Sequence, residues 1–233
     1  MEVEEGHIAP ITVEILGPPG SGKSTLVDAL QASSLKIVPV SIYWRRLENL
    51  SVGVRSAVAL IPIILSRLSG QALSAKHVVW MIRLEAADAI FQRKGVTRPS
   101  IAVFDQGPVF TMVRLLNLAL RAAEGSRFRR WWEIKLDEWA QALDLVIFLD
   151  APNEVLIERI RRRTKSHVAK TRSYEETGAL LIDERTRYVA LTEALATRGS
   201  VSVLRLDTSA SVDQVAAEAK ACLQKMGSVE GRL

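Results

Sequence analysis

The stretch Gly17-Pro18-Pro19-Gly20-Ser21-Gly22-Lys23-Ser24-Thr25 decides the fold. It matches the pattern G-x-x-x-x-G-K-[ST] in full. An apolar run, Ile11–Leu16, precedes it, and a helical pattern follows it from Leu26 to Gln31. The alternative is a Gly-Pro turn with a chance Gly-Lys-Ser, which the strand before and the helix after disfavour. The sequence therefore predicts a phosphate-binding loop, or P-loop, between a strand and a helix.

Each residue type in this loop has a physical task. Gly17, Gly20 and Gly22 allow backbone angles and a close approach that a β-carbon would block. Successive backbone N–H groups form an anion-binding nest, and the helix that begins near Lys23 adds its positive dipole end. We expect Lys23 to reach the β- and γ-phosphates of ATP and the Ser24 hydroxyl to bind Mg²⁺. The loop thus predicts ATP and Mg²⁺ as cofactors, with all residues from 17 to 25 as the binding set.

Alternating apolar and amphipathic segments predict the rest of the fold. Five apolar, β-branched-rich runs indicate strands at 11–16, 35–40, 101–105, 145–149 and 201–206. Their nearly continuous hydrophobicity is typical of parallel strands covered on both faces. Helical patterns lie near 24–32, 71–94, 108–122, 127–142, 152–163, 174–197 and 211–225. This order predicts an α/β P-loop NTPase fold: a five-stranded parallel sheet with helices on both faces, in three α/β/α layers.

The segment from 41 to 70 is apolar and is predicted to be helical, with breaks at Gly53, Pro62 and Gly70. The whole chain of 233 residues is predicted to form one domain. Its 48% hydrophobic content supports a sizeable core. Its net charge of +5 suits anionic ligands such as nucleotides and leaves nucleic acid open as a partner. A homodimer also stays open.

The composition also bears on location. One cysteine, Cys222, excludes a disulfide framework within the chain, which fits a reducing cytoplasm. The acidic start, Met1–Glu5, lacks the basic residues of a signal or transit peptide. The longest apolar run, Ala57–Leu65, is interrupted by Pro62 and is far shorter than the roughly 20 residues of a membrane-spanning helix. We expect a cytoplasmic protein with no transmembrane segment. For this run a buried or acceptor-pocket helix is favoured, and a peripheral membrane contact stays open.

A second acidic anchor is predicted at Asp105, which follows four apolar residues in the run Ile101–Asp105. Ligands of open parallel sheets bind at the carboxyl ends of strands, so Asp105 is expected to face the same crevice as Lys23. There it would hold Mg²⁺ through water or accept the proton of the phosphate acceptor. The alternative is a cap for the helix after Gly107, and the P-loop favours the functional role. Asp150 ends the next strand in the same way, but capping of the following helix explains it at least as well.

A basic segment follows the fourth strand. Seven Lys and Arg residues, and neither Asp nor Glu, lie between Arg159 and Arg172. Arg159, Arg162 and Arg163 have helical spacing and share one face. We expect them to form a catalytic lid, at about 159–173, that stabilises charge on the transferring phosphoryl group. A solvated basic face is the first alternative. A nucleic-acid patch is the second, although interleaved aromatic residues for base stacking are absent from the segment.

In order and spacing these motifs resemble the thymidylate kinase and nucleoside-monophosphate kinase group of P-loop kinases. Trp80-Met81-Ile82-Arg83 lies where thymidylate kinases carry an acceptor-binding Arg on a helix. The run 144–150, followed by Arg159, is similar to the family's fourth strand and the start of its lid. Leu206-Asp207-Thr208-Ser209 resembles the loop near the adenine base, which makes Thr208 a nucleotide-binding candidate. The resemblance implies an ATP-dependent kinase of a small molecule, with an acceptor-side helical region at about 41–95.

Two departures from that family lie on the acceptor side. Thymidylate kinases usually have Asp-Arg after the third strand, and this chain has Asp105-Gln106. Their Arg-Glu-Pro element after the second strand is also absent. Tyr43, Trp44, Arg45 and Arg83 remain the acceptor-pocket candidates, because aromatic rings stack on bases and arginines bind phosphate. Core packing is the alternative for Tyr43 and Trp44.

The sequence leaves two rival functions open. One is phosphorylation of a non-nucleotide alcohol or of a polynucleotide end. The other is a nucleotide-dependent switch or ATPase, which needs a water-positioning residue and sensor elements that the sequence does not reveal.

Overall fold

The computed structural model describes residues 10–67, 73–97, 99–122, 124, 126–163 and 171–229. The elements follow in the order β1 (Ile11–Leu16), α1 (Lys23–Gln31), β2 (Ile37–Val40), the 3₁₀ turn η1 (Leu47–Asn49), α2 (Leu50–Arg67), α3 (Ala75–Arg93), β3 (Ile101–Asp105), α4 (Pro108–Leu120), α5 (Arg127–Ala142), β4 (Leu145–Asp150), α6 (Asn153–Arg162), α7 (Tyr174–Ala196), β5 (Ser202–Asp207) and α8 (Val212–Val229). All five predicted strands and all seven predicted helices are present, with ends that differ by a few residues.

The five strands form one parallel sheet in the order β2-β3-β1-β4-β5. The P-loop strand β1 is therefore central, with β3 on one side and β4 on the other. Ile15 on β1 pairs in register with Asp105 on β3, and Leu16 pairs with Phe148 on β4. This register places the end of β3 directly beside the start of the P-loop, as the position of Asp105 in the sequence predicts.

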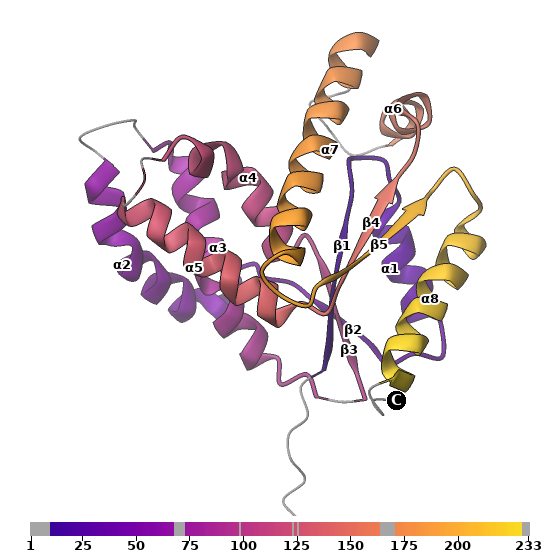
Figure 1. The fold of residues 1–233 in the computed structure, drawn as a ribbon, viewed down its shortest axis with the longest axis horizontal. Helices are drawn as coiled ribbons and strands as arrows, with labels where there is room; N and C mark the ends of the chain where they lie inside the picture. The colour runs from indigo at the N-terminus through magenta and orange to yellow at the C-terminus, as the bar shows by residue number, and fades with distance from the viewer. Residues whose placement is uncertain are drawn as a thin grey trace, which may run out of the picture.

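Helices cover both faces of the sheet, which confirms the three-layer prediction (Figure 1). Val13 and Ile15 of β1 pack in one core with Leu26 of α1 and Val215 of α8. Alternate residues point the other way, because side chains of a strand alternate between faces. On that second face β-strand residues such as Phe104 and Phe148 pack with residues of α3, α4, α5 and α7. The predicted acceptor-side helical region thus lies on the face opposite α1 and α8.

The predicted breaks at Gly53 and Pro62 are wrong, because α2 runs unbroken through both. A β-carbon at Gly53 would lie 2.4 Å from the Trp44 indole, so glycine serves close packing of the helix on that ring. Pro62 lies on the exposed face of α2, where water can satisfy the carbonyl that loses its helical partner. The third predicted break, Gly70, lies outside the described residues.

Helix α2 is longer than the apolar run Ala57–Leu65 that it contains. Together with η1 it forms a segment, Leu47–Ser66, that by length and a mean hydropathy of 1.6 is apolar enough to cross a membrane. It is the one such segment in the described part of the chain, and 28% of its most apolar window is buried. One side of α2 packs against α3 and α5. The run Ala57–Leu65 that the sequence singled out is therefore the middle of a longer apolar helix.

Candidate functional site

The P-loop wraps around the side chain of its own lysine. Gly17, Gly20 and Gly22 have φ angles of 144°, 92° and 85°, a region that disfavours residues with a β-carbon. Helix α1 begins at Lys23, immediately after this turn. The Lys23 ammonium donates to the carbonyls of Gly17 at 2.7 Å and Pro18 at 3.0 Å. The lysine, the loop amides and the helix N-terminus therefore lie together at the carboxyl end of β1.

Four charged side chains act on Lys23 from other elements. Burial lowers the pKa of Lys23 to about 8, and the charges of Glu184 and Asp105 oppose this shift. The charges of Arg163 and Arg114 lower the pKa further. These residues come from β3, α4, the end of α6 and α7. The electrostatic surroundings of Lys23 thus include both carboxylates and guanidinium groups, an arrangement suited to charge that moves between two bound molecules.

Asp105 and Ser24 are the candidate magnesium ligands, and each carries side-chain oxygen. Asp105 is half-buried at the end of β3, and Ser24 is exposed in the first turn of α1. A carboxylate and a hydroxyl are ligands that Mg²⁺ accepts, usually together with phosphate oxygens and water. Within the described residues there is no group of three or more His, Cys, Asp or Glu that could hold a metal ion. The donor set therefore fits a magnesium ion shared with a bound nucleotide.

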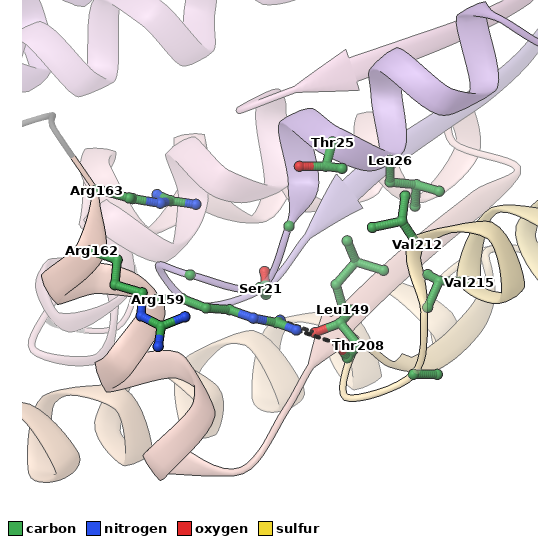
Figure 2. Close-up of a pocket in the computed structure, with 13 residues that line it drawn as sticks. Ser21, Thr25, Leu26, Leu149, Arg159, Arg162, Arg163, Thr208, Val212 and Val215 are labelled. Atoms are coloured by element: carbon green, nitrogen blue, oxygen red, sulfur yellow. Dashed lines mark hydrogen bonds between the residues drawn. The ribbon is translucent and has the colours of Figure 1, made fainter.

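A cavity of about 370 Å³ opens beside the P-loop (Figure 2). Figure 2 shows arginines of α6 along one wall and apolar side chains of α1 and α8, such as Leu26 and Val212, opposite them. The Arg159 guanidinium donates to the Thr208 hydroxyl at 3.2 Å and to its carbonyl at 2.7 Å. The cavity is lined by Gly20, Ser21, Gly22, Thr25, Leu26, Leu149, Arg159, Arg162, Arg163, Thr208, Ala210, Val212 and Val215. The structure thus brings the P-loop, Thr208 and all three lid arginines to one cavity.

The three lid arginines differ in their contacts. Arg159 bonds Thr208, as described above. Arg162 is 78% exposed and pairs with Glu158 at 2.6 Å. Arg163 directly follows α6, and its charge acts on Lys23. Of the three predicted lid arginines, Arg163 is therefore the one whose charge acts on the P-loop lysine. Residues 164–170 of the predicted lid, which include Lys165, His167 and Lys170, lie outside the described residues.

Arg83 and Tyr43 meet at the turn after β3. Arg83 is 4% exposed, and its guanidinium donates to the carbonyl of Gln106. Its Cζ lies 4.4 Å from the centre of the Tyr43 ring, and the Tyr43 hydroxyl donates to Gln106 Oε1 at 3.1 Å. Gln106 has a φ of 57°, unusual for a residue with a side chain and common at functional sites. Within the described residues the Arg83 Nε has no hydrogen-bond partner although it is buried.

Trp44 and Arg45, the other two acceptor-pocket candidates, have different surroundings. Trp44 packs against Gly53 and joins a small core with Val52, Ala86 and Ile90. The Arg45 guanidinium lies over the Trp44 ring at 5.2 Å. For Trp44 these contacts agree with the core-packing alternative.

A second cavity, of about 410 Å³, begins at Asp105 and Gln106. Tyr43, Arg46 and Lys94 contribute to its wall. The charge of Asp105 also acts on Lys23, so the Asp105 end of this cavity is within electrostatic reach of the P-loop lysine. A molecule there would have the Asp105 carboxylate at one end and cationic side chains along its side.

Three charged residues near the site were missed from the sequence. Arg114 on α4 pairs with buried Glu184 on α7 at 3.0 Å, and its Cζ lies 4.6 Å from the Phe110 ring. Neither residue belongs to a motif, and only the packing of α4 on α7 brings them together. Glu14 is fully buried in the central strand. Glu14 could have been recognised from the sequence, because its carboxylate interrupts the apolar run Ile11–Leu16.

Asp150 has a different role from Asp105. Its carboxylate accepts from the Arg185 guanidinium at 2.7 and 2.9 Å and from the Ala151 N–H at 2.8 Å. Arg185 also donates to the Ala151 carbonyl and to Asn153 at the start of α6. These bonds hold the β4–α6 turn against α7. Asp150 therefore holds the turn before α6. The predicted cap is wrong, because α6 begins after Pro152 without a side-chain cap hydrogen bond.

A central P-loop strand, a neighbouring strand that ends in Asp105 and a basic helix over the nucleotide cavity define a P-loop nucleotide-binding protein. The chain belongs to the family whose model is described as an AAA domain, since that model matches residues 13–180. A search of the curated proteins gives no match.

Solved structures show the same fold. Deoxyadenosine kinase from M. mycoides with bound dATP is 16% identical and has a TM-score of 0.53, over 92% of this chain and 99% of that chain. The same kinase with bound dCTP gives a TM-score of 0.51 at 16% identity, over 92% and 100% of the two chains. The fold is therefore that of a P-loop kinase, as the sequence resemblance implies.

Proposed function

We propose that this protein is an ATP- and Mg²⁺-dependent phosphotransferase acting on a small molecule, most like a thymidylate or other nucleoside-monophosphate kinase. The observation that carries the proposal is the convergence of Lys23 and Asp105 at the carboxyl ends of adjacent strands. A complete P-loop lies at one side of this point and a cavity that starts at Asp105 lies at the other. A donor and an acceptor can therefore meet between them.

The chain's own residues would act mainly by positioning and charge neutralisation, as in other phosphoryl transfer. Lys23, the N-terminus of α1 and Arg163 would stabilise negative charge on the transferring phosphoryl group. Asp105 would accept the proton of the acceptor or help to hold the metal ion. Ser24 and Asp105 are the residues that would hold Mg²⁺, which neutralises charge on the β- and γ-phosphate oxygens when it is bound.

Two arginines support an anionic acceptor. Arg83 and Arg114 both lie against the Phe110 ring, at 5.9 and 4.6 Å from its centre. Burial lowers the pKa of Arg83, while Tyr43, Glu14 and Asp105 favour its charged form. Two guanidinium groups beside one ring offer the charge-assisted hydrogen bonds that a phosphate accepts. A nucleoside monophosphate supplies both that phosphate and a base for the Tyr43 ring.

A nucleoside without a phosphate is the second candidate acceptor. The similar solved structures favour it, because they are structures of a deoxyadenosine kinase. In that case Arg83 would serve only to fix the turn at Gln106. The location that we propose is the cytoplasm, on the evidence of the single cysteine, and the chain is proposed to act as one domain.

The test is a screen with γ-labelled ATP and Mg²⁺ against nucleosides, nucleoside monophosphates and sugars, with separation of the products. We expect label on a nucleoside monophosphate, converted into the diphosphate. Label on a nucleoside instead would support the second candidate. Label released only as free phosphate would contradict a kinase and indicate an ATPase or switch.

A further inference from the structure

Glu14 lies fully buried in the central strand of the sheet. It is 0% exposed, in the middle of β1, with β3 and β4 hydrogen-bonded on either side. A carboxylate in such a place costs folding free energy unless hydrogen bonds and opposite charge compensate for lost water. The P-loop does not use it, and the strand around it is otherwise apolar apart from Thr12. The contacts of Glu14 must therefore compensate for the cost of burying its carboxylate.

The contacts of Glu14 are the first backbone N–H groups of α4. Oε2 accepts from the Val109 N–H at 2.8 Å, and Oε1 accepts from the Phe110 N–H at 2.9 Å. Helix α4 begins at Pro108, which has no N–H, and Thr111 donates to the Gly107 carbonyl at 3.1 Å. Glu14 therefore satisfies from another element the two donors that an N-terminal cap usually satisfies.

A local cap has no room at this helix start. The N-cap residue is Gly107, and a β-carbon there would lie 2.6 Å from the Phe104 β-carbon and 2.9 Å from Glu14 Oε2. Real β-carbons do not approach other atoms so closely, so position 107 cannot carry a capping Ser or Asp without displacing its neighbours. The cap has to come from the strand beneath, and Glu14 lies there because it pairs in register with Phe104.

Asp105 ends β3 directly before the turn that leads to this cap. Glu14 holds the far end of this turn through its hydrogen bonds with the Val109 and Phe110 N–H groups. Arg83 holds the Gln106 carbonyl, and Tyr43 holds the Gln106 side chain, in a backbone conformation with φ of 57°. That conformation persists only where surrounding contacts over-determine it. The charge of Arg83 also acts on Glu14, so the two anchors of the turn are coupled.

We propose that Glu14 is a positioning residue: by holding the first turn of α4 it fixes the turn 105–107 and so places the Asp105 carboxylate opposite Lys23. This inference rests on the proposed function, in which Asp105 serves the acceptor or the metal. It differs from a purely structural role, because loss of Glu14 should lower turnover through Asp105. A displacement of about 1 Å at a reacting group is enough to lower a rate by about 100-fold.

The test combines Glu14→Gln with Asp105→Asn in a double-mutant cycle. Glu14→Gln keeps the shape but replaces one accepting oxygen by a donor that faces an N–H group. The matched control is Asp144→Asn, since the Asp144 carboxylate also accepts a backbone N–H of β1, that of Thr12 at 2.8 Å, at the opposite end of the strand. Circular dichroism at the assay temperature establishes that each variant is folded.

We expect Glu14→Gln to lower kcat by about 100-fold with ATP affinity within about twofold, and Asp144→Asn to keep kcat. The double variant should be no slower than Asp105→Asn, within about threefold, because the positioned group is already gone. Additive losses, or wild-type turnover in either Glu14→Gln or Asp105→Asn, overturn the inference.

Amide hydrogen exchange separates this inference from the proposed function. Exchange at Val109 and Phe110 should be faster in Glu14→Gln than in Asp144→Asn, and this can be measured without any acceptor. Unchanged protection at both amides overturns the anchoring. If the wild-type protein transfers phosphate to none of the acceptors while these amides lose protection, the proposed function fails and the anchoring by Glu14 stands.

Discussion

The pH dependence of folding stability offers a quantitative check on Glu14. Burial raises the pKa of Glu14 from 4.5 to about 7, against the opposing effects of the Phe110 and Val109 N–H groups and of Arg83. Between these two values the native protein holds a proton on Glu14 that the unfolded chain has released. The unfolded state therefore binds fewer protons, and stability falls as the pH rises through this window.

The magnitude follows from the size of the shift. One pKa unit corresponds to about 1.4 kcal/mol, so the full shift amounts to about 3 kcal/mol. From pH 5 to pH 8 the free energy of unfolding should fall by about 2 to 3 kcal/mol through this one group. Glu14→Gln removes the titrating group and with it this contribution.

The assay is urea denaturation of the wild-type protein and of Glu14→Gln, followed by circular dichroism at steps between pH 5 and pH 8. The difference between the two curves cancels groups that titrate alike in both proteins. The wild-type protein should lose stability more steeply with rising pH than the variant does. Parallel curves, or a wild-type protein that gains stability relative to the variant, would refute the assignment of a buried, weakly acidic carboxyl to Glu14.

Four further predictions concern the nucleotide site. Lys23→Ala should abolish phosphoryl transfer without loss of the circular dichroism signal, because Lys23 is the cation nearest the expected phosphates; normal turnover in the variant would contradict the mechanism. Ser24→Ala should weaken binding of Mg²⁺-ATP more than binding of metal-free ATP in titration calorimetry, and equal losses would count against a metal role. Asp105→Asn should lower kcat by about 100-fold or more with little change in ATP affinity, whereas a residue that only caps a helix would tolerate Asn. ATP binding should weaken by about tenfold between pH 7.5 and 9.5, because the pKa of Lys23 is about 8 in the free protein and bound phosphates favour its charged form; a constant affinity would exclude that titration.

The parts of the site that were predictable have local signals. The P-loop is a contiguous motif between a strand and a helix, and its geometry follows from residues next to one another. Asp105 was predictable because an apolar run that ends in a carboxylate marks the end of a parallel strand. The register of Ile15 with Asp105 confirms that the two strand ends are neighbours.

The acceptor side depends on packing between distant segments and could not be read from spacing. Tyr43 and Arg83 are separated by 40 residues in sequence, and only the fold brings both to Gln106. Arg114 and Glu184 meet because α4 packs on α7. The helix break at Gly53 was wrong because intrinsic helix preference is weak and tertiary packing against Trp44 overrides it. The break at Pro62 was wrong because the proline lies on the exposed face of α2.

The most direct test of the central claim is to follow the γ-phosphate itself. Phosphorus NMR of the wild-type protein with ATP, Mg²⁺ and nucleoside monophosphates would record both the donor and the products in one sample. The proposed function predicts that the γ-phosphate signal of ATP declines while the two signals of a new nucleoside diphosphate grow. A decline of the γ-phosphate signal matched only by inorganic phosphate, with every monophosphate unchanged, would contradict it.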